Sequence, residues 1–162
     1  MRFGEWRPAP RRQPRGTPLV VVLLLLALTS LGLSVVGPAW ADQARRERER
    51  ELLRMGALYA RALASYRAAS PGSDKHHPER LDQLLADTRF VGTMRHLRKL
   101  YPDPLRPGAS WGLVKDTAGR IVGVYSQSED APIARGPQQL DGVTLPAASR
   151  YSDWKFMAKE SP

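Results

Sequence analysis

The sequence contains no cysteine, which excludes disulfide bonds and metal sites built on thiolates. It has only three histidines, too few to supply most catalytic or zinc centres. No glycine-rich loop of the phosphate-binding kind is present. We therefore expect a protein with a structural or binding role, with no enzyme activity, no bound metal and no cofactor.

Acidic residues are scarce compared with basic ones. The chain has 25 Lys and Arg against 16 Asp and Glu, which gives a formal net charge of +9. Such a balance favours anionic partners, either lipid headgroups or nucleic acid. The basic segment at residues 94–101 includes Tyr101 but offers no row of aromatic rings on which bases could stack. We do not expect nucleic acid to be a partner.

Charged side chains are missing altogether from residues 19–36, which are almost entirely apolar. A helix rises about 1.5 Å per residue, so roughly 20 apolar residues cross a hydrocarbon core of about 30 Å. The pattern predicts a transmembrane helix over residues 18–40, preceded by a basic tail at residues 1–17. The lipid bilayer is the partner that this helix implies.

Three interpretations of residues 1–41 stay open. A secretory signal peptide fits the basic start and the cleavage pattern Ala39-Trp40-Ala41, although the apolar run is longer than usual. An uncleaved anchor fits the length, but five arginines precede the run and five follow closely, so charge does not orient it. The third interpretation, a removable leader, rests on a resemblance given below.

Residues 41–69 predict an amphipathic helical stem that continues the apolar helix. Its first part is a charged run in which Glu47–Arg50 and Glu51–Arg54 are spaced to form ion pairs. Its second part repeats apolar residues every three or four positions, which is the pattern of one buried stripe. Ser70-Pro71-Gly72 marks the expected end of the helix.

The remaining sequence predicts two further regions. Residues 70–110 form a helix and loop region, with a short helix at residues 78–85. Residues 111–162 form a small antiparallel sheet of about three strands, at 111–115, 121–125 and 151–156, with a polar loop at 127–149. The expected fold class is α+β, a long N-terminal helix packed on this sheet.

Six aromatic side chains are the predicted structural core between the stem and the sheet: Tyr59, Tyr66, Trp111, Tyr125, Trp154 and Phe156. The histidines and the scattered carboxylates predict no site of their own. His76 and His77 are adjacent on a loop, and His96 has no serine in a nucleophile motif beside it. The carboxylates of Glu129, Asp130, Asp141 and Asp153 are too scattered for the six to eight oxygen ligands that calcium takes.

Several fragments, taken in order, resemble a subgroup of type II secretion pseudopilin-like proteins of the type IV pilin superfamily. Together they cover nearly all of residues 45–156. The fragments are Arg48-Glu49-Arg50-Glu51-Leu52-Leu53, Ser70-Pro71-Gly72, Arg95-His96-Leu97-Arg98-Lys99-Leu100-Tyr101, Trp111-Gly112-Leu113-Val114, Gly123-Val124-Tyr125-Ser126 and Tyr151-Ser152-Asp153-Trp154-Lys155-Phe156.

The resemblance implies a pilin-like fold and a structural subunit of a type II secretion or pilus-like apparatus. It places the chain in the bacterial inner membrane as a single-pass protein with its C-terminal domain in the periplasm. Its partners would be other pseudopilin subunits, contacted through the apolar helix. A peptidase of the family would cut between Gly16 and Thr17, and Val21 then stands where the family usually has glutamate. The rival interpretation is a single-span scaffold or accessory protein with no filament role.

Overall fold

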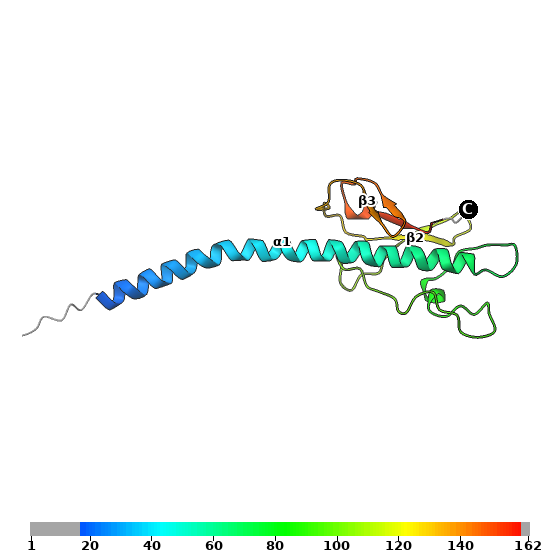
Figure 1. Cartoon of the computed structure of the whole chain (residues 1–162), viewed down its shortest axis with the longest axis horizontal. Coiled ribbons are helices and arrows are strands. Elements are labelled where there is room, and N and C mark those ends of the chain that lie inside the picture. Colours follow the sequence, from blue (N-terminus) through cyan, green and yellow to red (C-terminus); the bar gives the residue numbers. More distant parts are fainter. Residues whose placement is uncertain (1–16, 160–162) are drawn as a thin grey trace, which may run out of the picture. The chain divides into compact units, whose positions relative to one another are not determined.

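A single long helix runs through much of the chain in the computed structural model. The structure describes the backbone of residues 17–159 and the side chains of residues 18–30 and 40–159. Helix α1 spans Thr17–Ala68, 52 residues (Figure 1). The chain divides into two compact units, Met1–Asp42 and Gln43–Pro162, and we call the second the head unit.

Helix α1 ends where the sequence predicted an end. The last backbone bonds run from the amide of Ala69 to the carbonyl of Ser65 (2.9 Å) and from Ser70 to Arg67 (3.1 Å). Pro71 follows and cannot continue the helical hydrogen-bond ladder. Gly72 then adopts a φ of 77°, a conformation that glycine takes at little cost.

Three antiparallel strands form the main sheet of the head unit: β1 (Gly112–Lys115), β2 (Ile121–Tyr125) and β5 (Lys155–Met157), in the order β1-β2-β5. Figure 1 shows the strands on one side of α1 and the segment between α1 and β1 on the other. The β1–β2 turn is fixed by Asp116, whose carboxylate accepts bonds from the amides of Ala118 (2.9 Å) and Arg120 (2.8 Å). The predicted α+β class and three-stranded antiparallel sheet are confirmed.

Two predicted elements are shorter than expected. The helix predicted at residues 78–85 is only a 3-10 turn, η1 (Leu81–Leu84). The carbonyl of Pro78 instead accepts a bond from the amide of Ile121 (2.7 Å), which ties this segment to β2. The strand predicted at residues 151–156 begins as a second 3-10 turn, η2 (Tyr151–Asp153), before β5.

The region predicted as a polar loop, residues 127–149, contains a hairpin. Strands β3 (Gln138–Leu140) and β4 (Val143–Leu145) pair in antiparallel register around Asp141-Gly142. Both turn residues have positive φ, 49° and 82°, as the favoured two-residue hairpin turn requires. Leu145 and Val143 are buried, so the hairpin adds to the core rather than forming a solvated loop.

The core of the head unit lies between α1 and the main sheet. Gly56 lets the helix approach closely, because a Cβ there would lie 2.4 Å from three ring atoms of Phe156. Five of the six predicted core aromatics are buried, each at most 5% exposed: Tyr59, Tyr66, Trp111, Trp154 and Phe156.

Tyr125 differs from the prediction that placed it in the core. Its cross-strand partners are Gly112 in β1 and the exposed Lys155 in β5, and directly opposed residues share one face of a sheet. The buried pair Val124 and Phe156 occupies the other face. The half-buried Tyr125 ring instead covers Gly112, where a Cβ would lie 2.3 Å from its Cζ. Residues 124 and 125 necessarily face opposite ways in a strand.

Replacing Gly56 by alanine should destabilise the head unit by about 2 kcal/mol, because overpacking a tight contact costs more than the helix gains from alanine. Chemical denaturation followed by circular dichroism would measure the change. Gly136→Ala is the matched control, since a Cβ there meets nothing within 4 Å. Equal stability of the two variants would show that α1 and β5 do not pack as described.

Candidate functional site

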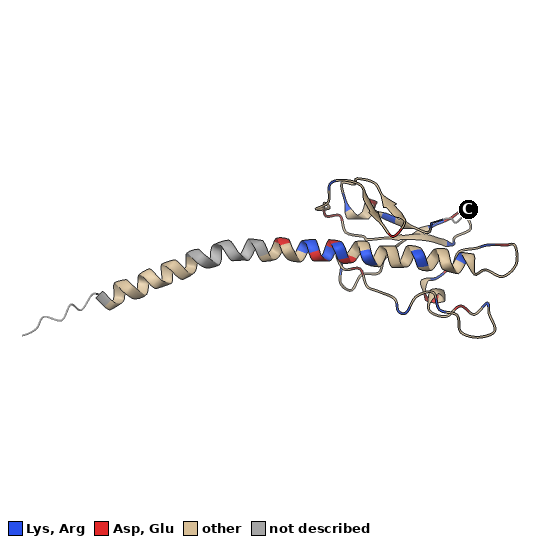
Figure 2. Ribbon diagram, viewed as in Figure 1, with Lys and Arg blue, Asp and Glu red and all other residues tan. Residues whose placement is uncertain are grey.

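The first described part of α1 is apolar on all sides. In residues 19–28 every large side chain is between 52% and 66% exposed, with no buried stripe. Figure 2 shows no charged residue on this part of the ribbon, whereas charges crowd the helix from Asp42 to Arg54. A helix that is apolar all round needs an apolar environment on every side.

The two hydroxyl residues that follow this segment make bonds within the helix. Thr29 Oγ1 lies 2.9 Å from the carbonyl oxygen of Leu26 and 3.0 Å from that of Leu25. Ser30 Oγ donates to the carbonyl of Leu26 (2.8 Å). Internal bonds of this kind satisfy hydroxyl groups without water.

Within the part of the chain that the structure describes, no helix carries a stretch long and apolar enough to cross a membrane. The predicted span at residues 18–40 includes residues 31–39, whose side chains lie outside the described set. Of the two predicted processing residues, Gly16 lies outside the described residues and Thr17 is the first residue of α1, with its side chain not described.

The charged run of α1 is mostly solvated, with one exception. The predicted pairs are present: Arg50 Nη1 lies 2.9 Å from Glu47, and Arg54 Nε lies 3.0 Å from Glu51, all four side chains being well exposed. Such surface pairs each contribute only a few tenths of a kcal/mol. Glu49, in the middle of this run, is only 7% exposed.

Glu49 connects α1 by hydrogen bonds to residues of the head unit that are distant in the sequence. Its carboxylate accepts bonds from the amides of Ile133 (2.7 Å) and Ala134 (3.1 Å) and from the hydroxyl of Tyr151 (2.6 Å). Burial, and then the hydrogen bond to Glu49, raises the pKa of the Tyr151 phenol. This role of Glu49 could not be predicted from the sequence, because its partners lie more than 80 residues away.

A second buried carboxylate, Asp87, organises the opposite end of the helix within the head unit. Arg89 forms a two-pronged ion pair with it, through Nε (2.8 Å) and Nη2 (2.6 Å). The same guanidinium donates to Ser70 Oγ (2.7 Å) and to the carbonyl of Tyr66 (2.8 Å), and lies 3.6 Å from the centroid of the Tyr66 ring. Hydrogen bonds from Arg89 hold the pKa of Asp87 well below its usual range.

His96 joins this network and brings Ser65 into it, a serine that stands in no nucleophile motif. Its Nε2 lies 3.2 Å from Asp87 Oδ2, and its Nδ1 lies 2.9 Å from Ser65 Oγ. The contact between Ser65 and His96 could not be predicted from the sequence, since the two residues are 31 positions apart on different elements.

The Ser65–His96–Asp87 order resembles that of a catalytic triad, but the Asp87 carboxylate also forms a two-pronged ion pair with Arg89. Asp87 is already neutralised by Arg89, which weakens its ability to stabilise a histidinium ion. Ser65 lies inside α1. The network instead connects the last turns of α1 to residues 87–96.

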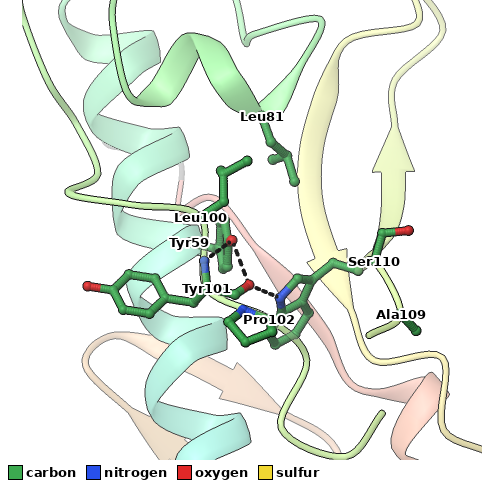
Figure 3. A pocket seen from close by; sticks show the side chains of 8 residues that line it. Tyr59, Leu81, Leu100, Tyr101, Pro102, Ala109 and Ser110 are labelled. Atoms are coloured by element: carbon green, nitrogen blue, oxygen red, sulfur yellow. Dashed lines mark hydrogen bonds between the residues drawn. The ribbon is translucent and has the colours of Figure 1, made fainter. Parts of the chain in front are cut away.

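The head unit also has an apolar groove of about 250 Å³, drawn in Figure 3. Leu81, Leu100 and Pro102 line it together with three aromatic residues. The aromatic residues are held by shared bonds: the hydroxyl of Tyr59 accepts from the amide of Tyr101 (2.8 Å) and donates to its carbonyl (3.0 Å), and Trp111 Nε1 donates to that carbonyl (2.8 Å). These bonds hold the side chains of Tyr59 and Trp111 against the backbone of Tyr101.

The other residues considered from the sequence have separate partners. His76 Nδ1 lies 3.3 Å from the carbonyl of Asp74, and His77 is buried. Of the scattered carboxylates, Glu129 pairs with Arg150 (2.6 Å) and Asp141 with Arg61 (3.3 Å). Among the described residues no group of three or more histidine, cysteine or acidic side chains converges as metal ligands do.

Comparisons with family models, with curated proteins and with solved structures found no match to this chain.

Proposed function

We propose that this protein is a non-enzymatic, structural subunit of the pseudopilin type, anchored in the bacterial inner membrane by the first half of α1, with the head unit in the periplasm. The observation that supports this best is the division of one helix into two kinds of surface. Residues 19–28 expose apolar side chains on every side, while residues 52–66 bury one stripe against the head unit. A pilin-like subunit needs this combination of an insertable helix and a folded head.

The apolar half of α1 has two partners in this proposal, lipid and the corresponding helices of neighbouring subunits. Neither contact demands polar complementarity, so a helix that is apolar all round serves both. The head unit then makes polar contacts with neighbouring heads. The periplasmic position rests on the resemblance of residues 45–156 to pseudopilins, because arginine counts do not orient the span.

Val21 suggests a special place in the assembly. A mature chain beginning at Thr17 would carry a charged N-terminal amine. In the family a glutamate at the fifth mature position pairs with this amine, and this chain has Val21 there instead. An unpaired charge at depth in a bilayer costs about 3 kcal/mol. This cost disfavours insertion of the subunit beneath subunits already in the filament, but it does not disfavour a subunit that starts the filament. We therefore propose that this subunit is present in few copies, at one end of the assembly.

Mass spectrometry of the intact, membrane-extracted protein should show a chain that begins at Thr17. Gly16→Val is the control, because it removes the proposed cleavage residue and should leave a chain that begins at Met1. A start at Met1 in the unmodified protein would favour the single-span scaffold instead. A start at Asp42 would make the apolar segment a signal peptide and contradict the anchored subunit. Copy numbers close to those of a major subunit would contradict the terminal position.

A further inference from the structure

The apolar groove of the head unit adjoins a second, charged cavity. The charged cavity has a volume of about 330 Å³ and shares Tyr101 and Pro102 with the apolar groove. Glu51, Arg54 and Lys99 contribute its charges. At about 250 Å³ the apolar groove is below the roughly 300–1,000 Å³ of most small-molecule sites, which suits a single large side chain.

The charged cavity has an excess of positive charge. Arg54 is paired with Glu51 through two bonds, of 3.0 and 3.2 Å. Lys99 has no acidic partner among the described residues, and its Nζ lies 5.3 Å from the centroid of the Tyr101 ring. Next to it, Leu100 is 43% exposed although it lines the apolar groove. The ammonium group of Lys99, which has no carboxylate partner among the described residues, thus lies next to the exposed apolar surface of the groove.

We propose that these adjoining cavities bind an acidic segment of a partner protein. One large apolar side chain of the segment occupies the groove over Tyr59 and Trp111. A neighbouring carboxylate lies beside Lys99, which supplies the complementary charge. This arrangement follows the usual division of an interface into an apolar anchor and a polar rim. The inference concerns the head unit alone and holds wherever the chain is anchored.

A protein partner fits the surface better than a nucleic acid does. Nucleic-acid bases bind by stacking on exposed aromatic faces. Tyr59 is 1% exposed and Trp111 is 5% exposed, so their rings form the floor of the groove and not a stacking platform. Lys99 itself lies over the Tyr101 ring. The groove therefore accepts an inserted side chain, not a flat base.

The test is fluorescence anisotropy with the full chain in detergent micelles. The probe is a fluorescein-labelled, acetylated peptide with a central tryptophan and two glutamates on each side. Lys99→Glu should weaken binding roughly tenfold, because an attractive charge becomes a repulsive one. Lys155→Glu is the matched control: it makes the same change of charge at an exposed position on β5 and should alter binding by less than about twofold.

Replacing the tryptophan of the peptide by alanine, or its glutamates by lysines, should abolish saturable binding. Leu100→Ser should weaken binding without changing the charge of the protein. Unchanged melting temperatures would show that the variants are folded. If Lys99→Glu lowers the melting temperature, the affinity of Leu100→Ser decides the test. A lack of saturable binding between the peptide and the unmodified protein would overturn the proposal. Equal affinities of Lys99→Glu and Lys155→Glu, or displacement of the peptide by a single-stranded oligothymidine of higher affinity, would also overturn it.

Discussion

Replacing Trp154 by alanine should lower the free energy of unfolding of the head unit by about 3 to 5 kcal/mol, the usual cost of removing a buried large aromatic side chain. Trp154 is fully buried, and its ring meets that of Tyr151 edge-on at 5.4 Å between centroids. Its Nε1 donates to the carbonyl of Pro146 (3.1 Å), which holds the segment after β4. The substitution would leave a cavity and an unpaired carbonyl.

Denaturant titration of the full chain in micelles, followed by far-UV circular dichroism, would measure this loss. Trp40→Ala is the matched control, because it is the same substitution at a side chain that is 74% exposed and lies outside the head unit. It should change the unfolding free energy by less than about 0.5 kcal/mol. A loss that small for Trp154→Ala would mean that the ring does not belong to the core.

Replacing Asp87 by alanine should cost about 3 to 5 kcal/mol, because it leaves the guanidinium of Arg89 without its partner at a mostly buried position. The Asp87 side chain is fully buried and that of Arg89 is 15% exposed. The Asp82–Arg80 pair offers the control, since Asp82→Ala removes a similar bond of 2.7 Å between exposed side chains. That change should cost no more than about 1 kcal/mol. Equal losses would show that the Asp87 network is solvated.

The same carboxylate should make the head unit sensitive to acid. Its pKa is lower in the folded protein than in the unfolded chain, where it is about 3.9. The ionised form therefore stabilises the fold above about pH 4, and this contribution disappears as the pH falls further. Asp87→Asn should flatten the acid side of a stability profile. A profile identical to that of the unmodified protein would contradict the assignment.

The sequence predicted those parts of the fold that depend on local patterns. The apolar repeat from Leu52 to Tyr66 and the stop at Ser70-Pro71-Gly72 located the buried stripe and the end of α1. Strand β2 was predicted with its observed bounds, because a clear turn signal precedes it and its residues are mostly β-branched or aromatic. One local signal was missed: Asp141-Gly142 is a dipeptide typical of two-residue hairpin turns, and it forms the turn between β3 and β4.

The polar contacts of the head unit could not be predicted, because they join residues far apart in the chain. Glu49 looks like one of several solvated glutamates until the segment at residues 133–134 is placed against it. Ser65 and His96 become neighbours only when α1 packs against the following segment. Tyr125 was assigned to the wrong face because aromatic character was given more weight than the alternation of the strand.

The most direct test of the proposed anchoring is the accessibility of single cysteines, which the cysteine-free sequence makes possible without removing native thiols. Leu24→Cys probes the apolar segment and Lys115→Cys probes the exposed surface of the head unit. In cells with a permeabilised outer membrane, a membrane-impermeant maleimide should label Lys115→Cys. It should label Leu24→Cys only after detergent dissolves the membrane. Rapid labelling of Leu24→Cys in intact membranes, or no labelling of Lys115→Cys, would contradict an inner-membrane anchor with a periplasmic head.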